Sequence, residues 1–317
     1  MKAVFPRLVR RLTVALALLF AALTVATPAQ AAPCASNCLA PGDYTFVTIS
    51  SLTPRYYLVH VPASYTGQSA VPLLLDIHGF TSYAADERKY SGQLQQSDQR
   101  GFIAVWPDGI GLSWNAYGCC AAANAANLND VAFLRQVIVE MKGKANVDDT
   151  RVFVTGISNG GGMAQRMACE AADLVRAAAS VSFPLNTDSC HPAKPIGLTE
   201  IAATGDATIS YAGNTSPIPL LGNDVAGVPL GVQGAMQSLA EWKTIAGCTS
   251  DLAATQINDQ VSSLVYTNCN GGVREGLVTV TGGKHVLYAN YVGLGYDGTY
   301  VPPIDVAPYI WDNVFNM

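Results

Sequence analysis

Residues 151–162 read Arg-Val-Phe-Val-Thr-Gly-Ile-Ser-Asn-Gly-Gly-Gly, and this stretch decides the fold class. Its first part is an apolar run that predicts a buried strand, and a helical pattern follows from about residue 161 to 172. Between them, Gly156-Ile157-Ser158-Asn159-Gly160 has the G-x-S-x-G spacing of a sharp strand-to-helix turn that exposes a serine hydroxyl. Glycine is needed on both sides because larger side chains would clash in so tight a turn. We therefore predict that Ser158 is a nucleophile; the alternative is a glycine-rich turn with an incidental serine.

Apolar runs bounded by glycine, proline and aspartate recur on both sides of this turn. A helical pattern also follows Asp130, with Asn129 or Asp130 placed to cap its first turn. Strands that alternate with helices indicate βαβ units. The predicted class is therefore α/β, and the serine turn favours the α/β-hydrolase fold, a mostly parallel central sheet flanked by helices. Besides 152–155, the predicted strands are 56–61, 71–77, 102–106, 177–182, 201–204 and 277–280.

A serine nucleophile needs a base, and the chain has only four histidines. In α/β-hydrolases the acid and then the histidine follow the serine along the chain. His60 and His78 precede Ser158, and His191 follows it too closely to leave a strand for the acid between them. The predicted base is therefore His285, in a Gly-Gly-Lys-His turn just after a predicted strand. The alternative is a surface histidine in a glycine-rich turn.

The base in turn needs a carboxylate that orients it. Asp206 lies directly after the predicted strand 201–204, on the loop where the acid of this fold is expected. Asp224 and Asp259 are alternatives, but no strand-like run immediately precedes either of them. Asp188 is read as a turn residue. We therefore predict Asp206 as the acid, against the alternative of an ordinary turn aspartate.

A hydrolase of this fold also needs two backbone N–H donors for the developing oxyanion. One comes from the residue after the nucleophile, here Asn159, and the other from a loop after an earlier strand. That loop reads His78-Gly79-Phe80-Thr81, so Phe80 or Thr81 is the predicted second donor. His78 is a candidate for the substrate site, with stabilisation of the loop as the alternative. No metal or cofactor is expected, since the chain has no C-x-x-C pair and little histidine.

A further set of motifs is spread over nearly all of residues 32–317. Taken together these motifs are specific for a protein family, although any one of them alone is weak evidence. They are Asp76-Ile77-His78-Gly79, Trp106-Pro107-Asp108-Gly109, Ser113-Trp114-Asn115, Cys119-Cys120, Asn129-Asp130-Val131-Ala132-Phe133-Leu134, Gly156-Ile157-Ser158-Asn159-Gly160-Gly161, Asp206-Ala207-Thr208-Ile209-Ser210-Tyr211 and Gly282-Gly283-Lys284-His285. In these motifs the chain resembles secreted esterases related to polyhydroxybutyrate depolymerases, feruloyl esterases and acetyl xylan esterases. The resemblance implies the triad Ser158, Asp206 and His285. It also implies that Trp114 lines the substrate site, with a core aromatic as the alternative.

The expected protein is thus a secreted serine carboxylic-ester hydrolase that works by two-step acyl transfer. Members of the group often have proline in place of Ser210 and tryptophan where this chain has Val286-Leu287-Tyr288, so substrate preference stays open. Polymer-degrading relatives usually carry an extra substrate-binding domain, and we expect none here. This favours feruloyl or acetyl esters of plant polysaccharides, or short-chain esters, over the alternative of a polyhydroxybutyrate polyester. A peptidase, thioesterase or lipase, and a non-catalytic secreted binding protein on the same fold, are further alternatives.

Composition fits an exported globular protein. Of 317 residues, 50% are hydrophobic and 13% charged, which predicts a large core, and the net charge of −5 argues against a nucleic-acid partner. Residues 1–31 have the basic, apolar and A-x-A segments of a signal peptide, which leaves 32–317 as a single catalytic domain. We expect a secreted or periplasmic monomer without a membrane anchor after cleavage, and an ester as its substrate.

The cysteines point to the same compartment. Eight of them follow the predicted cleavage point, and an even number in an oxidising compartment suggests disulfides. Cys248 and Cys269 are expected to form a local bridge, whereas the adjacent Cys119 and Cys120 are expected to bond to different partners. The Gly- and Pro-rich stretch 207–234 predicts a long loop or a lid beside the site.

Overall fold

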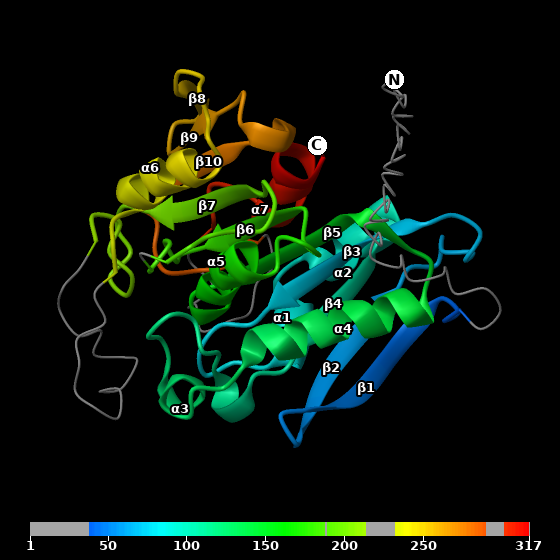
Figure 1. The fold of residues 1–317 in the computed structure, drawn as a ribbon. Coiled ribbons are helices and arrows are strands. Elements are labelled where there is room, and N and C mark those ends of the chain that lie inside the picture. The colour runs from blue at the N-terminus through cyan, green and yellow to red at the C-terminus, as the bar shows by residue number, and fades with distance from the viewer. Residues whose placement is uncertain (1–37, 188, 214–231, 290–300, 317) are drawn as a thin grey trace, which may run out of the picture. The chain divides into compact units, whose positions relative to one another are not determined.

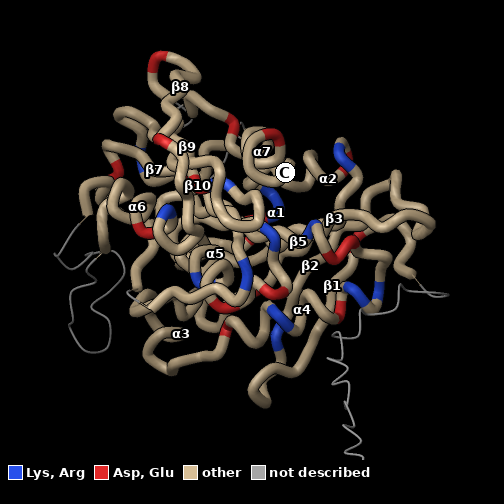
Figure 2. Tube along the Cα trace, turned by 45° about the horizontal axis from the view of Figure 1, so that its top comes forward, with Lys and Arg blue, Asp and Glu red and all other residues tan. Residues whose placement is uncertain are grey.

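The computed structural model describes residues 38–187, 189–213, 232–289 and 301–316, all of which belong to the compact unit Ala32–Met317. The predicted signal peptide, Asp188, Asp224 and most of the predicted lid lie outside the described residues. Within the described part of the chain, no helix has the length and apolarity needed to cross a membrane. Figure 2 shows Lys and Arg interspersed with Asp and Glu over the described elements.

One sheet of ten strands, in the order β1-β2-β4-β3-β5-β6-β7-β10-β9-β8, organises the described chain (Figure 1). The central strands, from β4 through β10 in this order, pair in parallel, whereas β1 and β2 at one end and β8 and β9 at the other pair antiparallel. The strands are β1 (Gly42–Ser50), β2 (Thr53–Val61), β3 (Val71–Ile77), β4 (Ile103–Pro107), β5 (Val147–Ile157), β6 (Ala177–Val181), β7 (Gly197–Ala203), β8 (Ala253–Asn258), β9 (Val261–Tyr266) and β10 (Glu275–Val280). The predicted mostly parallel sheet is therefore confirmed.

Helices cover both faces of this sheet because its central strands are apolar on both sides. On β3, Leu73 and Leu75 pack into a core with α4 and α5, which cross in front of the sheet in Figure 1. Leu74, between them, packs on the opposite face into a core with α1, α7 and Trp311. The helices are α1 (Ala84–Tyr90), α2 (Gln93–Arg100), α3 (Ala121–Ala125), α4 (Asp130–Lys144), α5 (Asn159–Glu170), α6 (Ala235–Ile245) and α7 (Val306–Ile310).

The start of α4 resolves one alternative left open above. The Asn129 side chain accepts a hydrogen bond from the N–H of Ala132, so Asn129 is the capping residue. Asp130 is fully buried instead and accepts from the Arg55 guanidinium at 2.8 Å and from the N–H of Asn115 at 2.8 Å. The cap therefore sets the beginning of α4, while Asp130 ties β2 to the loop that follows β4.

Disulfides join Cys119 to Cys120, Cys169 to Cys190 and Cys248 to Cys269. The predicted bridge between Cys248 and Cys269 is confirmed. The expectation that Cys119 and Cys120 bond to different partners is wrong, because the two adjacent cysteines bond to each other.

Removal of the Cys248–Cys269 bridge should lower the free energy of unfolding by about 3 kcal/mol, as expected for a crosslink closing a loop of this size. The two cysteines are 21 residues apart in sequence. Urea unfolding of the Cys248→Ser/Cys269→Ser variant measures the loss. The Cys169→Ser/Cys190→Ser variant should show a similar loss, since its bridge spans the same separation of 21 residues. An unchanged unfolding midpoint in both variants would contradict the loop-closure argument.

Candidate active site

Ser158 lies in the turn between β5 and α5 with φ 55° and ψ −124°, a conformation that residues other than glycine rarely adopt. Its N–H donates to the carbonyl of Val181, at the end of the neighbouring strand β6, at 2.8 Å. Such backbone strain persists only where the surroundings enforce it, and it is common at functional sites. The structure thus contains the sharp strand-to-helix turn that the sequence predicts around this serine.

The glycines of the motif are required by close backbone contacts. A Cβ atom at Gly156 would lie 2.6 Å from the carbonyl oxygens of Gly160 and Ile77. At Gly160 it would lie 2.0 Å from the carbonyl oxygen of Ile77. Neither contact is possible for a real side chain, so α5 can approach β3 and β5 this closely only with glycine at both positions. These contacts hold Ser158 at the carboxyl end of the sheet.

Asp206 and His285 are 79 residues apart in sequence and are hydrogen-bonded to each other, with His285 Nδ1 2.7 Å from Asp206 Oδ2. They follow β7 and β10, which pair in parallel up to Ala203 and Val280. Parallel strands have their carboxyl ends at one edge of the sheet, so both residues share that edge with Ser158. The structure therefore brings the predicted acid and base into contact and places the predicted nucleophile at the same edge.

The Asp206 carboxylate is held in one orientation. Its Oδ1 accepts from the N–H groups of Thr208 and Ile209, both at 2.8 Å, which leaves Oδ2 to His285. The Asp206 side chain is 1% exposed and that of His285 is 20% exposed. An ionised carboxylate can only accept, so the Nδ1 of His285 carries the proton of this hydrogen bond. The alternative acid Asp259 lies in the exposed turn between β8 and β9.

The loop after β3 narrows the choice of the second oxyanion donor. The Thr81 N–H donates to the carbonyl of Leu112 at 2.9 Å, so this amide already has an acceptor. Phe80 is the remaining candidate of the two. On the other side, Asn159 is the first residue of α5, where helical N–H groups have no acceptor within the helix. The geometry therefore favours the pair Asn159 and Phe80.

His78 and Trp114 are both fully buried, and their polar atoms bond to the protein. The Nε2 of His78 accepts from the N–H of Gly109 at 2.9 Å, so the proton is on Nδ1, which donates to the carbonyl of Gly79 at 2.8 Å. Burial lowers the pKa of this imidazole, in keeping with a neutral ring. These contacts favour the alternatives raised above, loop stabilisation for His78 and a core aromatic for Trp114. Their part in binding a substrate stays a prediction.

Glu200 is a buried acid beside the site that the sequence analysis missed. It lies in the middle of β7 and, with Ser182 and Asp206, lines a cavity of about 10 Å³, room for about one water molecule. Among the described residues, Glu200 Oε2 and Ser182 Oγ have no hydrogen-bond partner. Desolvation raises the pKa of Glu200 to about 8. The available signal was a single charged residue inside the apolar run Gly197–Ala203.

The pKa of Glu200 predicts a pH-dependent stability. The unfolded chain releases this proton near its ordinary pKa of 4.5, whereas the folded protein keeps it up to about pH 8. The contribution of Glu200 to the free energy of unfolding should therefore be largest below pH 4.5 and should fall as the pH rises to about 8. Glu200→Gln should reduce the fall between pH 5 and pH 8 by about 3 kcal/mol.

Urea unfolding of both proteins at a series of pH values measures this difference. A residual slope is expected in the variant, because burial also raises the pKa of Asp76, to about 7, and that of Glu87. If the free energy of unfolding depended on pH equally in the wild type and in Glu200→Gln, Glu200 would be ionised in the folded protein over this pH range.

A larger groove, of about 910 Å³, lies between the segment that leads into β7 and helix α6. Its lining includes His191, Lys194 and Glu241 but none of Ser158, Asp206 and His285. The candidate active site is therefore defined by the geometry at the sheet edge and not by the size of a cavity.

Comparison with solved structures identifies this architecture. An acetyl xylan esterase from Aspergillus awamori superimposes with a TM-score of 0.56 at 14% identity, over 76% of this chain and 94% of that one. The S954A mutant of the feruloyl esterase module from Clostridium thermocellum, complexed with sinapinate, gives 0.51 at 13% identity, over 85% and 88%. The fold is that of the α/β-hydrolases.

Relatives in sequence bear esterase names. Feruloyl esterase B of Piromyces equi is 32% identical over 240 residues, which make up 73% of this chain and 42% of that protein. Feruloyl esterase D of Neurospora crassa is 27% identical over 214 residues, 64% of this chain and 71% of that protein. No protein-family model matches the chain. The chain spans less than half the length of the Piromyces relative. These relatives and the fold confirm the predicted resemblance to esterases with the α/β-hydrolase fold.

Proposed function

We propose that the protein is a carboxylic-ester hydrolase with Ser158 as nucleophile, His285 as base and Asp206 as the acid that orients the base. The observation that carries the proposal is the 2.7 Å bond between His285 Nδ1 and Asp206 Oδ2, at the sheet edge where Ser158 occupies its strained turn. A binding protein has no need for these three residue types at the ends of three strands. The esterase names of the relatives support the same reaction class.

The proposed reaction has two acyl-transfer steps. His285 Nε2 takes the Ser158 proton as the serine oxygen attacks the ester carbonyl, and the carbonyl oxygen becomes an oxyanion bound by the N–H groups of Asn159 and Phe80. The C–O bond to the alcohol then breaks, and the alcohol leaves with the proton from His285. Water, deprotonated by His285, attacks the acyl-enzyme and releases the carboxylic acid and free Ser158.

We further propose feruloyl or acetyl esters of plant polysaccharides, or short-chain esters, as substrates. The names of the Piromyces and Neurospora relatives support the feruloyl group, and the likeness to the acetyl xylan esterase is one of fold. Export from the cytoplasm is part of the proposal, and the disulfides between described cysteines support it, since such bonds persist in oxidising compartments.

A matched substrate panel tests this proposal. The wild type and Ser158→Ala are assayed with p-nitrophenyl acetate, butyrate and octanoate, methyl ferulate, acetylated xylan and a polyhydroxybutyrate suspension. We expect hydrolysis of methyl ferulate, acetylated xylan or the shorter p-nitrophenyl esters by the wild type only. Turnover confined to the suspension would replace the proposed substrates with a polyester. A folded wild type that hydrolyses no ester would contradict the proposed function and favour a binding protein or a peptidase.

A further inference from the structure

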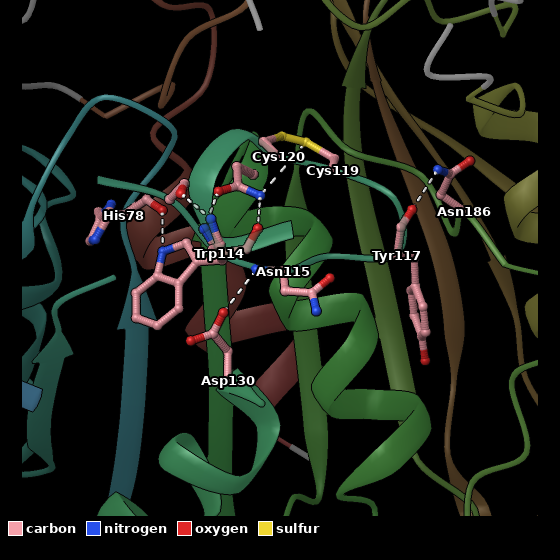
Figure 3. The surroundings of a disulfide bond; sticks show 11 residues. His78, Trp114, Asn115, Tyr117, Cys119, Cys120, Asp130 and Asn186 are labelled. Carbon is pink, nitrogen blue, oxygen red and sulfur yellow. Dashed lines mark hydrogen bonds between the residues drawn. A yellow bond between two sulfur atoms is a disulfide. The ribbon is translucent and has the colours of Figure 1, made fainter. Parts of the chain in front are cut away.

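The two proposed oxyanion donors lie in separate parts of the chain, and Trp114 is bonded to both parts. Its indole Nε1 donates to the carbonyl of His78 at 3.0 Å, two residues before Phe80 (Figure 3). Its backbone N–H donates to Asn159 Oδ1 at 2.7 Å, and Asn159 Nδ2 donates to the Trp114 carbonyl at 2.9 Å. One fully buried residue thus links the loop of one donor to the side chain of the other.

The Cys119–Cys120 disulfide lies beside the hydrogen bonds between Trp114 and Asn159. Asn159 Nδ2 also lies 3.7 Å from Cys119 Sγ, and the N–H of Cys120 donates to the Trp114 carbonyl at 3.0 Å. Figure 3 shows the bridge beside Trp114. The two cysteines are buried in an apolar cluster with Phe183 and Ile209, and Phe80 packs against this cluster. The disulfide therefore contacts the Asn159 side chain and belongs to the apolar cluster against which Phe80 packs.

We propose that Trp114 is a positioning residue, which together with the Cys119–Cys120 disulfide fixes the distance between the N–H groups of Asn159 and Phe80. The proposal rests on the proposed function, because it concerns the oxyanion of that reaction. Trp114 touches neither substrate nor reacting atoms in this role. It acts through the His78 carbonyl on one donor and through the Asn159 carboxamide on the other.

Such a link affects the transition state more than the bound ester. Oxyanion donors stabilise a charge that develops only during the reaction, and they must already be in place to do so. Loss of a single donor in such a site costs about 10² to 10³ in kcat, and a displacement of about 1 Å costs about 10². A loosened link should therefore lower kcat and leave KM nearly unchanged, because an interaction made only in the transition state is lost.

Trp114→Phe tests the link with the least change in packing. The variant keeps a buried aromatic ring between His78 and Phe133 and loses the N–H that donates to the His78 carbonyl. We expect kcat for p-nitrophenyl acetate to fall about ten- to a hundredfold at constant KM. The Cys119→Ala/Cys120→Ala variant should show the same pattern, and it carries the test if Trp114→Phe does not fold.

Trp242→Phe is the matched control. Trp242 is also buried, and its Nε1 donates to Gln165 Oε1 at 2.7 Å, in the middle of α5. This variant loses an equivalent hydrogen bond that contacts neither the Asn159 side chain nor the loop of Phe80. We expect a decrease in thermal stability similar to that of Trp114→Phe and an unchanged kcat.

Inhibition by phenylboronic acid separates positioning from a general structural effect. The boron accepts the Ser158 oxygen and becomes tetrahedral, with an oxygen at the oxyanion position. The inhibition constant should rise in Trp114→Phe by about the factor by which kcat falls, and stay constant in Trp242→Phe. A folded Trp114→Phe with wild-type kcat and inhibition constant would overturn this inference alone. A wild type that neither hydrolyses esters nor binds phenylboronic acid would instead overturn the proposed function.

Discussion

Ser158→Ala should reduce kcat for ester hydrolysis by roughly 10⁴ to 10⁶, the largest effect expected of any single substitution. Alanine removes the oxygen that forms the acyl-enzyme, and the strained turn at φ 55° stays occupied by a side chain with the same Cβ atom. The residual rate would come from the oxyanion donors acting on a water molecule. Initial rates with p-nitrophenyl acetate, together with a thermal melt to confirm folding, measure the effect.

Ser182→Ala provides the control for this substitution. Ser182 follows β6, the strand next to β5, and its backbone also has a positive φ of 54°. It differs from Ser158 in not preceding a helix and in being buried. Its replacement should leave kcat within a few-fold of the wild type. Comparable losses in both variants would indicate a general distortion of the sheet edge and would argue against Ser158 as the nucleophile.

Asp206→Asn should lower kcat by about 10⁴, the effect of a wrong imidazole tautomer in a serine triad. The N–H groups of Thr208 and Ile209 require an acceptor, so the amide oxygen should stay at the Oδ1 position. The amide NH₂ then faces His285 Nδ1 and donates to it. The proton of the neutral imidazole moves to Nε2, which can no longer accept the serine proton.

The paired variant Asp259→Asn completes this experiment, with kcat for p-nitrophenyl acetate measured in both variants. Asp259 is the other described candidate for the acid, and its exposed position predicts activity close to that of the wild type. A large loss in Asp259→Asn with a small loss in Asp206→Asn would reverse the assignment of the acid.

The central strands could be predicted because burial on both faces leaves a continuous apolar run. β3 has the predicted bounds, Val71–Ile77. The bounds of the predicted runs 177–182 and 277–280 differ by one or two residues from those of β6 and β10. The outer strand β8 could not be recognised. Its residues Ala253–Asn258 are all exposed, so no alternation of apolar and polar side chains marks the strand, and the backbone pairing with β9 forms it.

The site was predictable where the fold imposes an order along the chain. Four histidines and the order serine, acid, base suffice to select His285, and its bond to Asp206 agrees with that selection. The bonds of the Asn159 carboxamide and of the Thr81 amide could not be predicted, because they join loops 31 to 45 residues apart without any periodic pattern. The pairing of Cys119 with Cys120 was missed for a similar reason, since spacing does not determine disulfide connectivity.

Covalent labelling with a fluorophosphonate tests most directly whether Ser158 is an activated nucleophile. Such a reagent phosphonylates a serine whose proton is taken by a neighbouring base, with loss of fluoride, and peptide mass spectrometry identifies the labelled residue. We expect one label per chain, on the peptide that contains Gly156-Ile157-Ser158-Asn159-Gly160, and a loss of activity in proportion to the fraction of chains labelled, with little label in His285→Ala. An active protein that is labelled at a different residue, or whose activity survives complete exposure to the reagent, would contradict the assignment of Ser158 as the nucleophile.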